Sequence, residues 1–146
     1  PFPHCGSPMG FWCDLQSSAP EPCPAGRFGA TEGQANRQCD GPAAPGHFCA
    51  EGSTSSTSGV CPAGRFNPER GSTHNASCLP CEVGQDSLEG SATCTVCAQH
   101  FYRPHAGSSA SECMECNTIR GVACSWNATR RTLNLTKGFW RHSAMT

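Results

Sequence analysis

The chain has 146 residues, a formal net charge of −1 and 13 cysteines, but Leu, Ile, Val and Phe together supply only 17 residues. So few large apolar side chains exclude one large hydrophobic core, and they leave either disorder or covalent cross-linking. Six disulfides, each contributing on the order of 3 kcal/mol, favour cross-linking. The near-zero net charge gives no support for a nucleic-acid partner.

The cysteine content also indicates a compartment. In a reducing cytosol 13 thiols would need metal or catalytic roles, whereas in an oxidising space they pair, so we expect an extracellular protein. Three N-x-S/T sequons predict N-glycosylation at Asn75, Asn127 and Asn134. No apolar run approaches the ~18 residues of a membrane span. Because initiator Met and signal peptide are both missing, we expect a processed chain or a part of a longer one.

Two motifs repeat in the first half of the chain. Gly-Phe-Trp-Cys at residues 10–13 recurs as Gly-His-Phe-Cys at residues 46–49, and CPAGRF occurs at Cys23–Phe28 and at Cys61–Phe66. A period of about 37 residues indicates an array of small units. We therefore expect a partial repeat over residues 1–22 and a complete one over residues 23–60.

The hexapeptide CPAGRF predicts a tight turn followed by an extended segment. Its proline suits position i+1 of the turn and its glycine position i+3, which places Pro24 and Gly26 there in the first copy. Phe28 and Phe66 then begin extended segments, where we expect each ring to cover a nearby disulfide. In this interpretation one aromatic side chain per disulfide forms the core of each unit.

Between the two hexapeptides lies an uncharged low-complexity run. Its structural interpretation is a flexible spacer. Its functional interpretation is O-glycosylation on an exposed loop, with the candidate positions Ser53, Thr54, Ser55, Ser56, Thr57 and Ser58.

Residues 61–116 contain three Cys-x-x-Cys pairs, which begin at Cys78, Cys94 and Cys113. The loops between them are rich in Gly and Ser, which predicts short hairpins and turns with essentially no helix. The first two pairs would also suit tetrahedral Zn²⁺, with Cys78, Cys81, Cys94 and Cys97 as ligands and His100 and His105 nearby. The surrounding sequons and the other cysteines favour disulfides and no metal.

The last 30 residues differ in charge from the rest. Residues 1–116 carry 5 basic and 11 acidic residues, whereas residues 117–146 carry five basic residues and no acidic one: Arg120, Arg130, Arg131, Lys137 and Arg141. This asymmetry suggests docking to an acidic neighbour, for instance another copy head-to-tail. The alternative is that residues 117–146 start a further domain whose charges are solvated. Alternation over residues 132–136 predicts a strand with Leu133 and Leu135 on one face, before Gly138, Phe139 and Trp140.

The segments CPAGRF, GHFCAEGSTSS and CLPCEVGQDSLEGSATCTVC resemble the ephrin-receptor-like cysteine-rich repeats. These are related in style to the growth-factor-receptor, EGF-like and tumour-necrosis-factor-receptor modules, and the resemblance covers residues 5–116. Residues 132–141 also resemble a segment that follows such repeats in very large surface proteins of algae and other protists. The resemblance implies a structural or adhesive role without catalytic residues.

The resemblance further implies sequential disulfide pairing: Cys5–Cys13, Cys23–Cys39, Cys61–Cys78, Cys81–Cys94, Cys97–Cys113 and Cys116–Cys124. Ala43 stands where the family often has a cysteine, which leaves Cys49 unpaired or bonded to another chain. Spacing alone cannot fix connectivity, so a crossed pairing of Cys78 with Cys94 and Cys81 with Cys97 stays open.

The expected fold is a small, disulfide-rich, elongated array of β-hairpin and turn modules with little or no helix, each contacting mainly its neighbours. The expected function is a structural module of a glycosylated extracellular surface, matrix or filament protein, such as a flagellar hair (mastigoneme). Its partners would be copies of itself or other extracellular structural proteins, with no cofactor. The alternative is a ligand-binding or adhesion ectodomain of a cell-surface receptor. An enzyme is not expected, because the Cys-x-x-Cys pairs lack a βαβ context and Asp86 and Glu89 suit solvated loops.

Overall fold

The computed structural model describes residues 6–105, 108–136 and 138. Over these residues the chain forms strands of two or three residues, three short 3-10 turns and no α-helix. All but one of the strand pairings are antiparallel. The structure therefore confirms the expected disulfide-rich hairpin fold with little helix.

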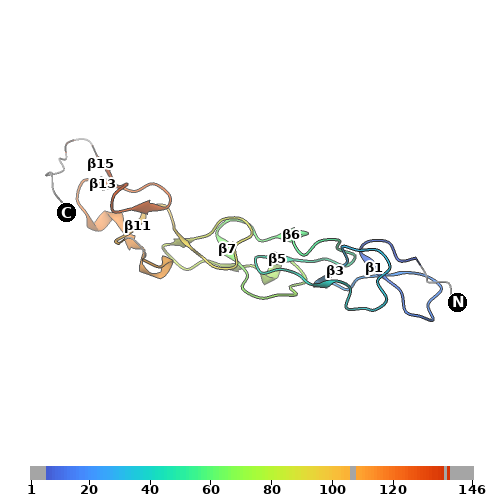
Figure 1. Cartoon of the computed structure of the whole chain (residues 1–146). Helices are drawn as coiled ribbons and strands as arrows, with labels where there is room; N and C mark the ends of the chain where they lie inside the picture. The colour runs from blue at the N-terminus through green and yellow to red at the C-terminus, as the bar shows by residue number, and fades with distance from the viewer. Residues whose placement is uncertain (1–5, 106–107, 137, 139–146) are drawn as a thin grey trace. The chain divides into compact units, whose positions relative to one another are not determined.

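Six hairpins follow one another along the chain and can be followed by colour in Figure 1. We number them by their strand pairs. Hairpins 1 to 3 are β1 (Phe11–Trp12) with β2 (Glu21–Pro22), β3 (Arg27–Phe28) with β4 (Gly41–Pro42), and β5 (His47–Phe48) with β6 (Gly59–Val60). Hairpins 4 to 6 are β7 (Arg65–Phe66) with β8 (Leu79–Pro80), β9 (Gln85–Asp86) with β10 (Val96–Cys97), and β11 (Phe101–Arg103) with β12 (Met114–Glu115).

The C-terminal part adds three strands. β13 (Val122–Ala123) pairs with β15 (Asn134–Leu135), while β14 (Ala128–Thr129) joins the edge of hairpin 6 in parallel with β11. The 3-10 turns are η1 (Asn75–Ser77), η2 (Ala110–Glu112) and η3 (Cys116–Thr118). Within the described residues no helix has the length and apolar character that a membrane crossing needs.

The turn in CPAGRF lies one residue later than predicted. The amide of Arg27 donates to the carbonyl of Pro24 at 3.1 Å, so the turn spans residues 24–27. Pro24 is therefore at position i and Gly26 at position i+2, where its φ of 85° is accessible to glycine without steric cost. The prediction of Pro24 at i+1 and Gly26 at i+3 is wrong, because the positive φ that this turn requires falls on the glycine.

The same turn opens every one of the six hairpins. The amide that follows the i+2 residue donates to the carbonyl three residues earlier in each case: Phe11 to Pro8, Arg27 to Pro24, His47 to Ala44, Arg65 to Pro62, Gln85 to Glu82 and Phe101 to Ala98. Gly-x-aromatic-Cys and CPAGRF are thus the same structural element. The structural repeat is one hairpin, about half the length of the sequence repeat.

A backbone ladder joins successive hairpins of the N-terminal half. In each of hairpins 2 to 5 a loop glycine donates its amide hydrogen to a carbonyl of the preceding hairpin. The acceptor is the residue just before the opening turn: Gly33 donates to Ser7, Gly52 to Cys23, Gly71 to Ala43 and Gly90 to Cys61, at 2.8–3.0 Å. Contacts also reach the second neighbour. A Cβ at Gly10, Gly26 or Gly46 would strike the carbonyl oxygen of Gly52, Gly71 or Gly90, respectively. Hairpins 1 to 5 therefore contact more than their adjacent partners.

The chain divides into two compact units, Pro1–Pro80 with Leu88–Thr93 and Cys81–Ser87 with Cys94–Thr146. In the first unit the fully buried positions are the larger polar residue Asn67 together with cysteines and small residues, among them Cys23, Ala43, Cys49 and Cys61. Phe28 and Phe66 are only half-buried, and the Phe28 ring lies over Gly41 on the paired strand. The cysteines and the backbone ladder, more than the aromatic rings, fill the centre of this unit.

The second unit has a small apolar cluster of Tyr102, Cys116, Cys124, Ala128 and Leu133. Leu133 is 8% exposed and Leu135 is 38% exposed, so the prediction that they share one face is wrong. The reason is that the strand is shorter than the predicted residues 132–136: β15 begins at Asn134, and Leu133 precedes it and packs into the cluster. Phe139 and Trp140 lie outside the described residues.

Candidate functional site

Five disulfides are the main chemical feature of the described chain. They are Cys23–Cys39, Cys61–Cys78, Cys81–Cys94, Cys97–Cys113 and Cys116–Cys124, with Cα–Cα distances from 5.6 to 6.2 Å. The first four close hairpins 2, 4, 5 and 6. These five pairs are the ones that the resemblance implied. Cys13 is also disulfide-bonded, and its expected partner Cys5 lies outside the described residues.

The central cysteines adopt neither of the two alternative arrangements, the crossed disulfide pairing and the zinc site. Cys78 bonds Cys61 and Cys81 bonds Cys94, so the crossed pairing is wrong. Cys97 bonds Cys113, which means that all four cysteines of the zinc alternative are engaged as disulfides. Among the described residues no three or more His, Cys, Asp or Glu side chains gather as metal ligands, His100 and His105 included.

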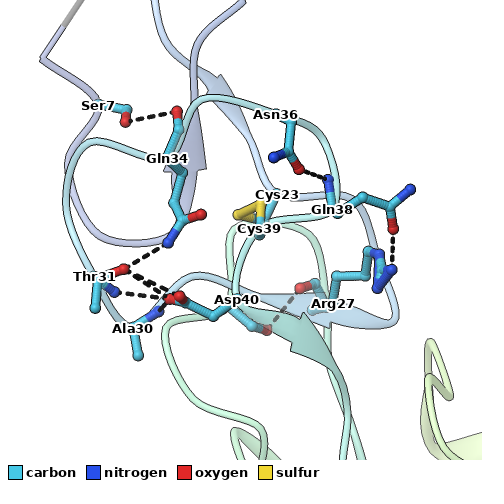
Figure 2. The surroundings of a disulfide bond; sticks show 12 residues. Ser7, Cys23, Arg27, Ala30, Thr31, Gln34, Asn36, Gln38, Cys39 and Asp40 are labelled. Atoms are coloured by element: carbon cyan, nitrogen blue, oxygen red, sulfur yellow. Dashed lines mark hydrogen bonds between the residues drawn. A yellow bond between two sulfur atoms is a disulfide. The ribbon is translucent and has the colours of Figure 1, made fainter.

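Polar contacts hold the loop that the Cys23–Cys39 disulfide closes (Figure 2). Asp40 follows this disulfide, and its carboxylate points back across the hairpin. One oxygen accepts the amides of Ala30 and Thr31 at 2.6 and 2.9 Å, and the Thr31 hydroxyl lies 3.1 Å from both oxygens. Desolvation acts to raise the pKa of Asp40, but these hydrogen bonds and one from Gln34 outweigh it and hold that pKa below its ordinary value.

The rest of this loop is also hydrogen-bonded. The Gln34 side chain donates to the Thr31 hydroxyl at 2.5 Å, and the Gln34 carbonyl accepts the Ser7 hydroxyl of hairpin 1 at 3.3 Å. Arg27 donates to the side chain of Gln38 on the opposite side of the disulfide. A disulfide and a polar network thus do the work that an apolar core does in larger domains.

Hairpin 3 has no disulfide. Ala43 occupies the position of Cys23 and Cys61, because its carbonyl accepts the loop glycine of the next hairpin in the same way, and it is fully buried. Cys49 is a free, fully buried cysteine whose thiol donates to the Ser55 carbonyl at 3.2 Å. Burial raises the pKa of the Cys49 thiol against hydrogen bonds from Ser53 and Ser58. Of the two expectations, an unpaired thiol fits this burial, and a bond to another chain does not.

The Ser/Thr run is an ordered part of hairpin 3. The buried Ser53 hydroxyl donates to the Ala50 carbonyl at 2.6 Å, and the Ser58 hydroxyl donates to the Ser55 carbonyl at 2.9 Å. The prediction of a flexible spacer is therefore wrong, since the polar side chains bond their own backbone. For O-glycosylation, Ser53 is buried and Ser56 half-buried, whereas the remaining candidates are exposed: Thr54, Ser55, Thr57 and Ser58.

The three sequon asparagines occupy different local structures and are all exposed. Asn75 is the first residue of η1, and Asn134 lies in β15. Asn127 has a φ of 53°, which is uncommon for a residue with a side chain but best tolerated by asparagine. Solvent exposure is therefore common to all three sites, whatever their local structure.

Several charged residues were predicted to be solvated. Glu89 is exposed as expected, but Asp86 is half-buried and accepts a hydrogen bond from the Trp126 indole nitrogen at 2.5 Å. The prediction is therefore wrong for Asp86, which joins hairpin 5 to the turn before β14. Of the five basic residues near the C-terminus, Arg120, Arg130 and Arg131 are exposed, and Lys137 and Arg141 lie outside the described residues.

The second unit also has a shallow cavity of about 510 Å³, open to solvent, that sequence reasoning missed. Its lining combines apolar groups with three polar side chains: His100, Phe101, Glu115, Cys116, Asn117, Val122, Ala123 and Cys124. His100 has a φ of 72° at the turn position that is glycine in the five preceding hairpins. A histidine in place of this glycine was the only signal of the cavity in the sequence, because the lining residues come from segments that the fold brings together.

No protein-family model and no curated protein matches this chain.

Proposed function

We propose that the chain is a non-catalytic structural module of an extracellular, glycosylated surface, matrix or filament protein. The observation that carries this proposal is the way the fold is held: five disulfides and a backbone ladder, with few buried apolar side chains. Such cross-links persist in oxidising compartments and are reduced in the cytosol. Covalently closed hairpins also resist proteolysis and shear, which suits a load-bearing external protein.

Two further features support the proposal. The three sequon asparagines are exposed, as N-glycosylation requires. The motif resemblance to ephrin-receptor-like repeats adds sequence support, since those repeats serve mostly structural or adhesive roles. Ligand-binding by a receptor ectodomain is the second candidate, and the cavity beside His100 and Glu115 is the observation that favours it.

Self-association is part of the proposal. Arg120, Arg130 and Arg131 are exposed in the second unit, whereas seven of the 11 acidic residues belong to the first. Opposite charges on the two units would guide head-to-tail contact between copies. Exposed charge pairs are weak and screened by salt, so this contact would be sensitive to ionic strength.

The test is secretion of the chain from eukaryotic cells, followed by electron microscopy and sedimentation at low and high salt. The proposal predicts a glycosylated product with its disulfides formed and Cys49 free, which assembles into fibres or oligomers at low salt and dissociates at high salt. Arg130→Glu with Arg131→Glu should weaken assembly, and Arg37→Glu, an exposed arginine of the first unit, is the matched control. A product that stays monomeric at every salt concentration contradicts self-association, and a product secreted behind an added signal peptide with its cysteines still reduced contradicts the structural role.

A further inference from the structure

The disulfides leave one long part of the first unit without any covalent cross-link. Hairpin 2 is closed by Cys23–Cys39 and hairpin 4 by Cys61–Cys78, so tension along the chain bypasses their loops. Residues 40–60, which include all of hairpin 3, carry that tension themselves. Elsewhere between Cys13 and Cys124 the longest uncrossed stretch is residues 14–22, and the others contain two residues each.

Only non-covalent contacts hold hairpin 3. Its strands pair over two residues each, and the Cys61 amide donates a hydrogen bond to the Gly46 carbonyl at 3.0 Å, which closes the hairpin. The Ala44 amide donates a hydrogen bond to the Ser56 carbonyl across the loop at 2.9 Å. A two-stranded hairpin of this size is marginal in water by itself, so its stability depends on its neighbours.

The neighbours of hairpin 3 hold it through backbone hydrogen bonds that can break without any covalent change. Gly46 donates to the Asn67 carbonyl at 2.7 Å and Cys49 to the Ser72 carbonyl at 2.9 Å, both in hairpin 4. On the other side, Gly52 donates to the Cys23 carbonyl at 2.8 Å. Hairpins 2 and 4 keep their own disulfides when these bonds break.

We propose that hairpin 3 is the extensible segment of this chain, which opens locally while hairpins 2 and 4 stay closed. Fully extended, the chain from Cys39 to Cys61 spans about 75 Å at ~3.4 Å per residue, against about 35 Å from Cys13 to Cys23. Opening uncovers Cys49, which is fully buried when the hairpin is closed. This inference concerns the chain itself and holds whether or not the proposed function is correct.

The free thiol provides a built-in measurement of opening. The oxidised full chain is treated with iodoacetamide over a series of urea concentrations below the unfolding transition, and the alkylation rate of Cys49 is followed by mass spectrometry. Local opening predicts alkylation with a weak dependence on urea, because only one hairpin is exposed. Alkylation that has the same urea dependence as global unfolding overturns the proposal.

A cross-strand disulfide in hairpin 3 supplies the matched variant. His47 and Val60 are directly paired, and both side chains lie beside Gly90, so they are on the same face. His47→Cys with Val60→Cys should form this disulfide and slow the alkylation of Cys49 about 100-fold. His47→Ser with Val60→Ser, which removes the same side chains without a bond, should not slow it. Equal rates in the two variants contradict the proposal.

Pulling the wild-type chain between handles placed directly after Cys13 and directly after Cys124, so that the uncrossed residues 125–146 carry no tension, gives a readout that does not depend on either variant. At forces that leave the disulfides intact, the proposal predicts that hairpin 3 opens first and lengthens the chain by at most about 75 Å. This lengthening should exceed the about 35 Å that residues 14–22 can provide. Lengthening confined to the smaller value, or none, overturns it.

Discussion

Hairpins 2 and 3 carry a cysteine at different equivalent positions. Hairpin 2 has Cys23 and Gly29 where hairpin 3 has Ala43 and Cys49. Gly29 follows β3 as Cys49 follows β5, and each donates its amide to the loop of the next hairpin. A Cβ at Gly29 would lie 2.9 Å from the Cys23 sulfur. Because Ala43 takes the place of Cys23 in hairpin 3, a sulfur at residue 43 would lie at a similar distance from the Cβ of Cys49. That distance suits a disulfide.

Ala43→Cys should therefore form a disulfide with Cys49. Thiol titration of the oxidised protein should show no free thiol, against one in the parent chain, and peptide mapping should show the 43–49 bond. The new loop should raise the free energy of unfolding by on the order of 2 kcal/mol. Ala44→Cys is the control, since its neighbouring position should leave two free thiols. Two titratable thiols in Ala43→Cys would show that hairpins 2 and 3 are not equivalent.

Asp40 should make stability depend on pH. Its hydrogen bonds lower its pKa in the folded state, so its contribution is complete above its unfolded pKa, near 4, and is lost as the pH falls through the lower folded value. Urea unfolding at pH 6, 4, 3 and 2 should show a smaller acid loss for Asp40→Asn than for the parent. Asp14→Asn, a change at an exposed aspartate, is the control. Parallel pH profiles for Asp40→Asn and the parent would contradict the assigned network.

At the scale of the element, steric fit across a hairpin explains some of the glycines. A Cβ on Gly59 would overlap the ring of Phe48 on the paired strand of hairpin 3. Gly59 has no positive φ, so the requirement comes from space and not from backbone conformation. Phe48 therefore lies flat over the position where another residue would carry a side chain.

Gly59→Ala should lower the free energy of unfolding by about 1–3 kcal/mol, because the Phe48 ring must leave its position. Urea unfolding followed by near-ultraviolet circular dichroism measures this. Gly6→Ala is the matched control, since a Cβ there meets nothing within 4 Å. If both variants lose the same stability, the close contact between Gly59 and Phe48 is not what the structure shows.

The sequence predicted short hairpins, and the resemblance to ephrin-receptor-like repeats implied the disulfide pairing, but neither gave the register of the repeat. Cysteine spacing restricts which residues can pair, and turn residues mark where hairpins reverse. The half-length repeat was missed because CPAGRF and Gly-x-aromatic-Cys share only a glycine two residues before an aromatic residue. That glycine carries the positive φ, so aligning glycines instead of cysteines would have found it.

Two other features could not be predicted, for a different reason. The glycines that form the ladder, Gly33, Gly52, Gly71 and Gly90, donate to residues of the preceding hairpin. The cavity beside His100 is likewise assembled from β11, β12, η3 and β13. Both depend on how hairpins stack, and a single sequence gives no direct signal for contacts between separate elements.

At the scale of the whole molecule, each unit is stabilised differently. The first unit buries cysteines and small residues within a hydrogen-bonded ladder, and the second adds an apolar cluster around Tyr102 and Leu133. In both units disulfides limit the unfolded chain to a smaller set of conformations, which favours the folded state. The account depends on this constraint replacing a large hydrophobic core.

Reduction of all disulfides tests this account most directly. The oxidised protein and the same protein held in excess reductant at neutral pH are compared by amide hydrogen exchange, with the reduced thiols counted. The account predicts one free thiol and protected ladder amides, such as that of Gly90, in the oxidised chain, and loss of amide protection in the ladder and in the second unit on full reduction. Retention of protected ladder amides in the fully reduced chain would contradict it.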